Sequence, residues 1–415
     1  MYYRKRLSML FILAMVASLA AGCSGSSKKA PADPTPTAAP EAVPTEAPAA
    51  TATPAPSPTP VPIDYKTAAI KDIYADYFLV GGVLGNSGMR DPSVSGIITA
   101  NFNSVTMENE MKPDSLLDYM TSISDPKYKE SPAVNYKTLD TCLKFAKDNG
   151  LKMRGHTLVW HSQTPRWFFT VDYSKDADAP FVTKEVMLKR MENYIKQILE
   201  YCQTNYPGVI YAWDVVNEAI EVNNLHPEGL RTEGSYWYTV VGDEFVEKAF
   251  EFARKYADPE VKLFYNDYGT EDSMKSSAIK KLAAKIKEQG NIDGIGLQTH
   301  ISIDSPSIND IDSTARSLAE LGLELQVTEL DMNMSANTEE DLAKQASRYR
   351  RLFLYFKKWV DDGIKLTSVT FWGTTDDRSW LNKPNAPSYP LLFDKNFEKK
   401  PAYFGVIQDP EVKLY

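Results

Sequence analysis

Short apolar segments typical of strands alternate with longer amphipathic segments from residue 63 to the end of the chain. The helical pattern, with apolar residues three and four positions apart, is clearest over residues 186–201, 245–256 and 342–359. Eight strands alternating with helices over about 350 residues are typical of an α/β fold, the (β/α)8 TIM barrel. An open, doubly wound parallel sheet has a similar rhythm, so periodicity alone leaves both folds open. The expected strands are residues 78–83, 104–107, 151–156, 209–216, 262–266, 294–299, 324–330 and 368–372.

The ends of these segments favour the barrel, because polar or aromatic side chains follow seven of the eight expected strands. The active site of a (β/α)8 barrel forms where the carboxyl ends of the strands converge with the loops that follow them. An open sheet instead gathers its site at one switch point in the strand order. We therefore predict a site at the carboxyl end of a barrel. Its candidate residues are Glu108, Asn109, Lys112, His156, Trp160, Asn217, Glu218, Asn266, Asp267, Tyr268, Gln298, His300, Glu329, Asp331 and Trp372.

Two carboxylates stand out among these residues, because Glu218 and Glu329 each directly follow an apolar strand. A carboxylate at a buried strand end is costly unless the protein uses it. Hydrolysis of a glycosidic bond usually needs two carboxyl groups, one on each side of the bond. The pattern by itself leaves open whether either glutamate is an ordinary surface charge.

Six short motifs stand out along the chain. They are residues 155–163 (GHTLVWHSQ), 213–219 (WDVVNEA), 265–268 (YNDY), 296–300 (GLQTH), 328–331 (TELD) and 371–373 (FWG), followed by Trp380. These motifs resemble those of glycoside hydrolase family 10, the endo-β-1,4-xylanases. They occur in the family's order, and the resemblance covers residues 63–415. It implies a TIM barrel and an enzyme that cleaves internal bonds of xylan.

The resemblance implies a role for each residue around the scissile bond. Glu218 would be the general acid and base, and Glu329 the nucleophile. Asn217 would bind the 2-hydroxyl of the sugar, while His300 and Asp331 would support Glu329. A separation of about 5–5.5 Å between the two carboxyl groups would give hydrolysis with retention of anomeric configuration.

The resemblance also implies a cradle for the sugar chain. Trp372 and Trp380 would form an aromatic platform, because sugars pack their C–H faces on indole rings. Bulk at Gln163 and Trp380 would favour xylose over glucose, which carries an extra hydroxymethyl group. The remaining substrate-binding candidates are Glu108, Asn109, Lys112, His156, Trp160, Tyr268 and Gln298.

The chain departs from the family pattern in two places. Gly269 and Thr270 follow Tyr268 where the family commonly has Asn, and the loop over residues 221–238 carries its own charges and aromatic side chains. Both departures fall where the leaving-group side of the cleft is expected, so no residue there is assigned.

Other functions remain as alternatives. A β-1,4-glucanase or a mixed-specificity hydrolase could use the same barrel, and a surface lipoprotein could bind xylan without cutting it. A transporter's solute-binding lipoprotein would be expected to show two lobes around a hinge, which the order of the motifs argues against.

Charge and spacing weaken several other classes of function. The net charge of −9 disfavours nucleic acid as a partner. His156 and His161 lack the spacing of a helical zinc motif, and we expect neither a metal ion nor a cofactor. We expect a monomer that acts on a polysaccharide.

The N-terminal part of the chain predicts export. Residues 1–22 combine basic residues with an apolar run that ends in small residues, which is typical of a signal peptide. The ending before Cys23 resembles a bacterial lipoprotein box, although the usual Leu lies one position early. We therefore expect Cys23 to be lipidated and to anchor the protein at a cell membrane or outer surface; ordinary secretion is the alternative.

The segment that follows predicts a spacer. Residues 24–62 are rich in Pro, Ala and Thr and indicate a disordered linker, leaving residues 63–415 as the catalytic domain. We interpret Cys142 and Cys202 as buried helix residues rather than a disulfide pair.

Overall fold

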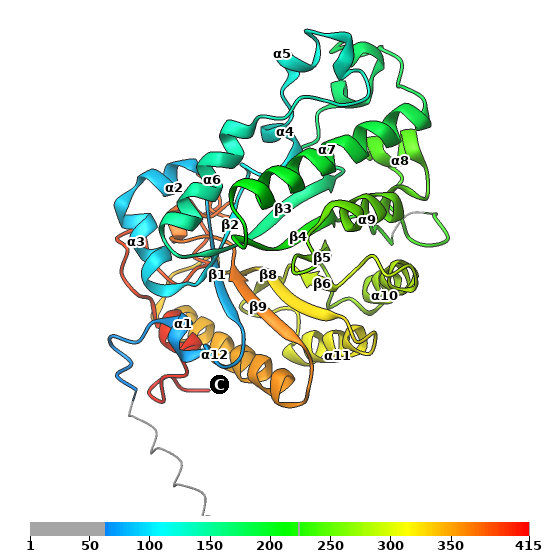
Figure 1. The fold of residues 1–415 in the computed structure, drawn as a ribbon. Coiled ribbons are helices and arrows are strands. Elements are labelled where there is room, and N and C mark those ends of the chain that lie inside the picture. Colours follow the sequence, from blue (N-terminus) through cyan, green and yellow to red (C-terminus); the bar gives the residue numbers. More distant parts are fainter. Residues whose placement is uncertain (1–62, 223–224, 415) are drawn as a thin grey trace, which may run out of the picture. The chain divides into compact units, whose positions relative to one another are not determined.

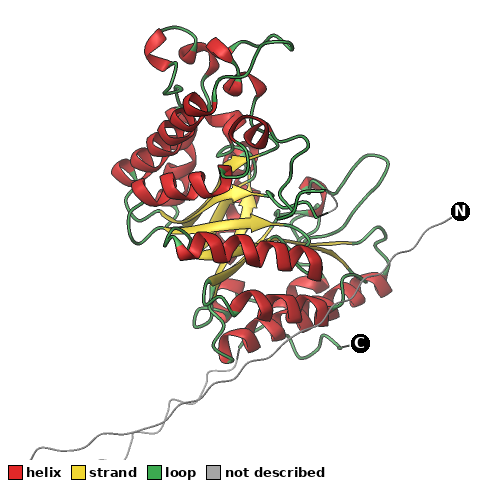
Figure 2. Ribbon diagram, turned by 90° about the vertical axis from the view of Figure 1, so that its right-hand side faces the viewer, coloured by secondary structure: helices red, strands yellow, loops and turns green. Residues whose placement is uncertain are grey.

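A computed structural model describes residues 63–222 and 225–414, so the expected signal peptide, Cys23 and the linker lie outside the described residues. Within them, the parallel strands form a closed ring with helices around it (Figures 1 and 2). The ring closes because β9 pairs with β1 and β6 pairs with β8. The barrel prediction is confirmed, and the open sheet is excluded. The strands are β1 (Leu79–Leu84), β2 (Ser104–Met107), β3 (Lys152–Trp160), β4 (Ile210–Asn217), β5 (Lys262–Asp267), β6 (Gly294–Leu297), β7 (His300–Ser302), β8 (Glu324–Asn333) and β9 (Leu366–Phe371).

The sixth strand is shorter than the expected residues 294–299. β6 ends at Leu297, and after a two-residue break the short strand β7 pairs with β8 alone. The reason is the backbone of Thr299, whose φ of 60° turns the chain out of the ladder. In contrast, β3 and β8 run further than expected, to Trp160 and Asn333.

The three helices expected most clearly are confirmed as α7 (Lys184–Asn205), α9 (Phe245–Tyr256) and α12 (Glu339–Asp361). The side chains of Thr183 and Thr338 cap α7 and α12 by accepting a backbone N–H from the first turn. The other α-helices are α1 (Ile70–Ile73), α2 (Asn86–Arg90), α3 (Pro92–Asn101), α4 (Pro113–Leu116), α5 (Tyr119–Ser122), α6 (Tyr136–Asp148), α8 (Tyr236–Val241), α10 (Ser273–Glu288), α11 (Ile308–Ala319) and α13 (Pro401–Val406).

Apolar side chains fill the layer between the strands and the surrounding helices. The helices pack here with buried residues such as Ile195, Phe250 and Phe353. Cys142 on α6 and Cys202 on α7 belong to this layer and are free, so their interpretation as buried helix residues is confirmed. In residues 63–222 and 225–414, no helix is long and apolar enough to cross a membrane.

A buried ion pair occupies the inside of the barrel. Arg154 on β3 contacts both carboxylate oxygens of Asp214 on β4, and its Nε donates to Gln326 on β8 over 2.8 Å. Arg154 is 1% exposed and Asp214 is fully buried. Separating the two partners would leave each charge buried and unpaired, which is costly. The pair therefore fixes the relative position of β3 and β4.

Candidate active site

A cleft with a volume of about 610 Å³ lies at the carboxyl ends of the barrel strands. It brings together nearly all of the predicted site residues, which come from the ends of strands all around the ring. Three of the candidates, Asn266, Asp267 and Asp331, do not line it but are fully buried, and Asp331 lies against His300. The lining residues are Glu108, Asn109, Lys112, His156, Trp160, Gln163, Asn217, Glu218, Tyr268, Gly269, Glu271, Gln298, His300, Glu329, Trp372 and Trp380.

Glu329 lies on β8 and is only 5% exposed. His300 Nε2 lies 3.1 Å from its Oε2, and Asn266 Nδ2 donates to its Oε1 over 2.7 Å. Burial raises the pKa of Glu329, but these hydrogen bonds and the charges of His156 and His300 outweigh it and lower the pKa to about 2. Glu329 is therefore held as a carboxylate at any ordinary pH.

His300 carries the positive charge beside this carboxylate. Its Nδ1 forms an ion pair with Asp331 Oδ1 at 3.0 Å, on the side away from Glu329. Burial lowers the pKa of His300, but the two carboxylates raise it to about 10. The imidazolium form, in which both ring nitrogens carry protons, is thus favoured between the two acids.

Glu218 follows β4 and has a different set of neighbours. Its Oε2 accepts from Trp160 Nε1 over 3.0 Å, and its Oε1 accepts from Gln298 Nε2 over 3.0 Å and Asn217 Nδ2 over 3.3 Å. Its backbone φ of 56° is in the left-handed region, which is costly for a residue with a side chain. The backbone N–H donates to the Asn266 carbonyl over 2.9 Å and helps hold this turn.

Three side-chain amides connect the two glutamates. Asn217 Oδ1 accepts from Gln298 Nε2 over 3.2 Å and from Asn266 Nδ2 over 2.9 Å. Gln298 also reaches Glu218, and Asn266 also reaches Glu329. Thr328 Oγ1 donates to Asn266 Oδ1 over 2.6 Å and fixes which way that amide points. The carboxylates therefore share one hydrogen-bonded frame in a single cleft.

The loops after β2 and β3 build one end of the cleft. Lys112 Nζ donates to Asn109 Oδ1 over 3.2 Å and Gln163 Oε1 over 2.9 Å, and it lies 4.8 Å from the centre of the Trp160 ring. Burial lowers the pKa of Lys112 and raises that of Glu108. The amide and ammonium groups here are held in place before any sugar binds.

His156 is tied to the ion pair inside the barrel. Its Nδ1 lies 2.8 Å from Asp214 Oδ2, and its ring meets Trp372 edge-on with centroids 5.3 Å apart. Trp372 is 7% exposed whereas Trp380 is 48% exposed, so the two expected platform residues differ in how far they reach into solvent.

Tyr268 lines another part of the cleft and is held by a residue of the loop after β4. Arg231 Nη2 donates to the Tyr268 hydroxyl over 3.0 Å and forms an ion pair with Glu221 at 3.2 Å. Lys275 lies over the Tyr268 ring at 3.2 Å from its centre. Apart from Tyr268, no residue was assigned here from the sequence, and the structure adds Glu271, which lines the cleft, with a pKa raised by burial.

Two residues that hold the others in place received no role from the sequence: Asp214, which was not a candidate, and Asn266, which was a candidate without an assigned role. Both stood inside the quoted motifs, at residues 213–219 and 265–268, so the motifs carried a signal. What the motifs lacked was the information that one binds His156 and the other joins Asn217 to Glu329.

Comparison with known proteins agrees with this site. The family model described as glycosyl hydrolase family 10 matches residues 69–409. Endo-1,4-beta-xylanase B of Butyrivibrio fibrisolvens is 41% identical over 343 residues, which cover 82% of this chain and 53% of that protein. Endo-1,4-beta-xylanase A of Thermotoga maritima is 41% identical over 353 residues, covering 83% of this chain and 31% of that protein.

A solved structure supports the same relationship. The CBM22-1 and GH10 modules of a Clostridium thermocellum endo-1,4-beta-D-xylanase 10B, in complex with xylohexaose, align with a TM-score of 0.75 and 36% identity, over 82% of this chain and 67% of that one. The chain spans about half and about a third of the length of the two curated relatives. Because the family model matches most of its length, and because the barrel and its carboxylates fit, the chain belongs to glycosyl hydrolase family 10.

Proposed function

We propose that the protein hydrolyses internal β-1,4-xylosidic bonds of xylan with retention of anomeric configuration. The observation that carries this proposal is the contrast between two glutamates in one cleft. Glu329 is held ionised by His300 and Asn266, whereas Glu218 is surrounded by amide and indole N–H groups. A double displacement needs one carboxylate to attack and one acid to protonate the leaving oxygen.

In the first step, a Glu329 oxygen attacks the anomeric carbon while the glycosidic C–O bond breaks. Glu218 gives its proton to the departing sugar oxygen, and the sugar stays linked to Glu329 as a glycosyl ester. In the second step, Glu218 takes a proton from water, the water oxygen attacks the same carbon, and Glu329 leaves as a carboxylate.

Neighbouring residues support each step. The Asn217 amide lies between the glutamates and is placed to meet the 2-hydroxyl of the bound sugar, a contact that strengthens in the transition state. Glu108, Asn109, Lys112 and Gln163 bind hydroxyls on the non-reducing side, and Trp372 and Trp380 pack against the sugar faces.

Related proteins support xylan as the substrate. The curated relatives are named endo-1,4-beta-xylanases, and the related Clostridium thermocellum modules hold xylohexaose. A β-1,4-glucanase on the same barrel is the competing proposal, because the mechanism is the same for both polymers.

The test is to follow reducing ends and the anomer of the products by NMR, with purified protein on β-1,4-xylan and on a soluble β-1,4-glucan. We expect rapid depolymerisation of xylan with β-configured ends appearing first, and no turnover by Glu329→Ala. Products that appear first in the α configuration would contradict the double displacement, and a preference for glucan would change the substrate.

We also propose that residues 1–22 are a lipoprotein signal peptide and that Cys23 carries the lipid anchor, with residues 24–62 as a spacer. The support is the composition of these segments. Cys23→Ala should move the protein from the membrane fraction to the soluble fraction without changing its specific activity. Continued membrane association of that variant would refute the anchor.

A further inference from the structure

Trp380 makes a contact that a sugar platform does not require. Its ring is 48% exposed and lines the cleft, yet its indole Nε1 turns inward and donates to Asp331 Oδ2 over 2.8 Å. Asp331 is fully buried. Stacking on a sugar uses only the face of the indole ring, so this hydrogen bond calls for a separate explanation.

The contact continues to the attacking carboxylate in two further steps. Asp331 Oδ1 lies 3.0 Å from His300 Nδ1, and His300 Nε2 lies 3.1 Å from Glu329 Oε2. The Trp380 ring also meets the His300 ring, with centroids 5.1 Å apart and an interplanar angle of 63°. Trp380 thus contacts both members of the pair that supports Glu329.

We propose that Trp380 is a positioning residue for the nucleophile, in addition to any contact with the sugar. Its N–H fixes the Asp331 carboxylate in the orientation that holds His300 against Glu329. Without this donor, one oxygen of a buried carboxylate loses its partner, and such an oxygen is costly to leave unpaired. The kinetic part of the test rests on the proposed function, whereas the spectroscopic part does not.

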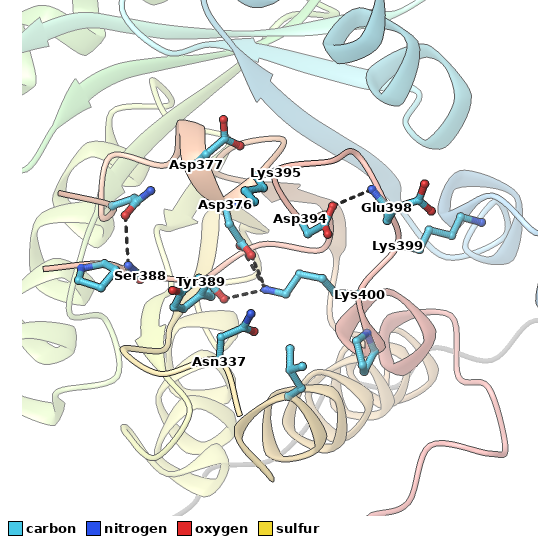
Figure 3. Close-up of a pocket in the computed structure, with 14 residues that line it drawn as sticks. Asn337, Asp376, Asp377, Ser388, Tyr389, Asp394, Lys395, Glu398, Lys399 and Lys400 are labelled. Carbon is cyan, nitrogen blue, oxygen red and sulfur yellow. Dashed lines mark hydrogen bonds and ion pairs between the residues drawn. The ribbon is translucent and has the colours of Figure 1, made fainter. Parts of the chain in front are cut away.

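A buried ion pair between Lys400 and Asp376 stabilises the loop that carries Trp380. Lys400 lines a second pocket, of about 530 Å³, and Figure 3 shows its Nζ directed at Asp376 and at the Tyr389 carbonyl. The distances are 2.9 Å to Asp376 Oδ2 and 2.8 Å to the carbonyl oxygen. Lys400 is 6% exposed and Asp376 is 5% exposed, so this ion pair is buried. Asp376 Oδ1 also accepts the Leu391 N–H over 2.8 Å. This hydrogen bond joins the two ends of the segment that contains Trp380.

The same loop is tied to the strand that carries Asp331. Ser388 Oγ donates to Asn333 Oδ1 over 2.7 Å at the end of β8, and Tyr389 N–H donates to the Met334 carbonyl over 2.9 Å. Donor and acceptor of the Trp380 hydrogen bond therefore belong to segments that are fastened to each other. The position of the indole is set by the protein and needs no bound sugar.

The test compares Trp380→Phe with Trp372→Phe in the full-length protein. Both variants shorten an aromatic side chain of the cleft, but only the first removes the N–H that binds Asp331. With an aryl β-xylobioside we expect Trp380→Phe to lower kcat on the order of tenfold, because a hydrogen bond to a buried charged group is lost. Trp372→Phe should act mainly on KM.

A second readout needs no turnover. In the free protein, NMR of ¹⁵N-labelled histidines should resolve the ring nitrogens of His300, which forms an ion pair with Asp331, from those of His156, which contacts Asp214. Trp380→Phe should shift or broaden the His300 signal and leave the His156 signal unchanged. His300→Gln identifies the resonance.

Two outcomes would overturn the proposal. One is an unchanged His300 signal in Trp380→Phe; the other is a loss confined to KM, as in Trp372→Phe. A double-mutant cycle with Asp331→Asn gives a further check, since effects through one chain of contacts are not additive. Additive losses in kcat would contradict the linkage, and the His300 signal tests it separately if xylan proves not to be the substrate.

Discussion

The oxygens of Glu329 and Glu218 face different donors, and this difference supports the roles proposed for the two glutamates. A charged imidazole and an amide hold the Glu329 carboxylate, whereas the Glu218 carboxylate accepts hydrogen bonds from neutral indole and amide N–H groups. A cationic donor stabilises a carboxylate more strongly than a neutral one does. The proposal that Glu329 is the nucleophile is therefore supported by side-chain contacts as well as by the motifs.

The acid role of Glu218 predicts a dependence on the leaving group. Glu218→Ala should slow hydrolysis of xylo-oligosaccharides by a factor on the order of 10² to 10⁴, the usual contribution of general acid catalysis. Aryl xylobiosides with good leaving groups should react with Glu329 nearly as fast as before, because they need no proton. The measurement is the burst of released phenol; an equal loss of that burst and of xylo-oligosaccharide cleavage would contradict the acid role.

The charge on His300 predicts how the pH profile moves. His300→Gln removes the cation that keeps the pKa of Glu329 at about 2, so the pKa of Glu329 should rise while its burial remains. The acid limb of kcat/KM should move up by at least about one pH unit, which corresponds to about 1.4 kcal/mol of lost stabilisation. Coinciding acid limbs in the two proteins would show that His300 does not control Glu329.

The same histidine predicts a change in stability with pH. The folded-state pKa of His300, about 10, is above the ordinary value of 6.5. Its contribution is therefore fully present below pH 6.5 and is lost as the pH rises through 10. In urea unfolding, the free energy of unfolding should fall less between pH 6.5 and 10 in His300→Gln than in the unmodified protein.

At the scale of residues, the sequence predicted which residues belong to the site but not the hydrogen bonds between them. Motifs placed Glu218, Glu329 and His300 at strand ends, which only required counting along the chain. The bond from Trp380 to Asp331 joins residues 49 positions apart, and nothing in either local sequence specifies it. Such contacts depend on how a loop folds back over the barrel.

Among the elements, β5 and β6 pack so closely that one position must lack a side chain. A Cβ at Gly296 would lie 2.2 Å from Asn266 Oδ1, well inside the contact distance of the two atoms. Asn266 is the amide that holds both Asn217 and Glu329. The spacing of these strands is therefore part of the site.

Gly296→Ala should consequently damage catalysis by displacing Asn266. We expect kcat to fall at least about tenfold, because a hydrogen bond to a charged carboxylate is weakened. The matched control is Gly96→Ala on α3, where a Cβ would meet nothing within 4 Å. That control should keep full kcat and the same or a slightly higher Tm; equal kcat in both variants would refute the argument.

The strand boundaries show where periodicity stops being informative. An apolar run marked residues 294–299 as one strand, but the positive φ of Thr299 ends it and starts β7. β8 extends to Asn333 and β3 to Trp160, and the added residues include buried apolar side chains as well as residues of the site. Burial and the site together therefore determine the residues at those ends.

On the scale of the whole molecule, the choice between a closed barrel and an open sheet depends on long-range pairing. The pairing of β1 with β9 joins residues 79–82 to residues 368–371, and the chain must bring both ends together to form it. The rhythm of strands and helices is common to both folds. Only the spread of active residues around the ring favoured the barrel in advance, and the structure confirms it.

The first and last described segments of the chain contact each other. Ile70 and Tyr74 are fully buried, and the Tyr74 hydroxyl donates to the Val406 carbonyl. On the other side, the Tyr403 hydroxyl of α13 donates to the Ala68 carbonyl over 2.7 Å. The segment before β1 is thus part of the core rather than an extension of the linker.

This packing predicts where the chain can be shortened. A protein that begins at residue 63 should match the longer one in Tm and in activity on soluble xylan, because the removed segment has a composition that buries little apolar area. One that begins at residue 79 loses Tyr74 and Phe78, which stack with ring centroids 5.0 Å apart, and it loses Ile70 as well. Removing one buried aromatic side chain costs about 3–5 kcal/mol. Since a domain is stable by only about 5–15 kcal/mol, the shorter protein should unfold or aggregate. Thermal unfolding of the two proteins, followed by circular dichroism, checks this; a lower Tm for the protein that begins at residue 63 would show that the linker stabilises the barrel.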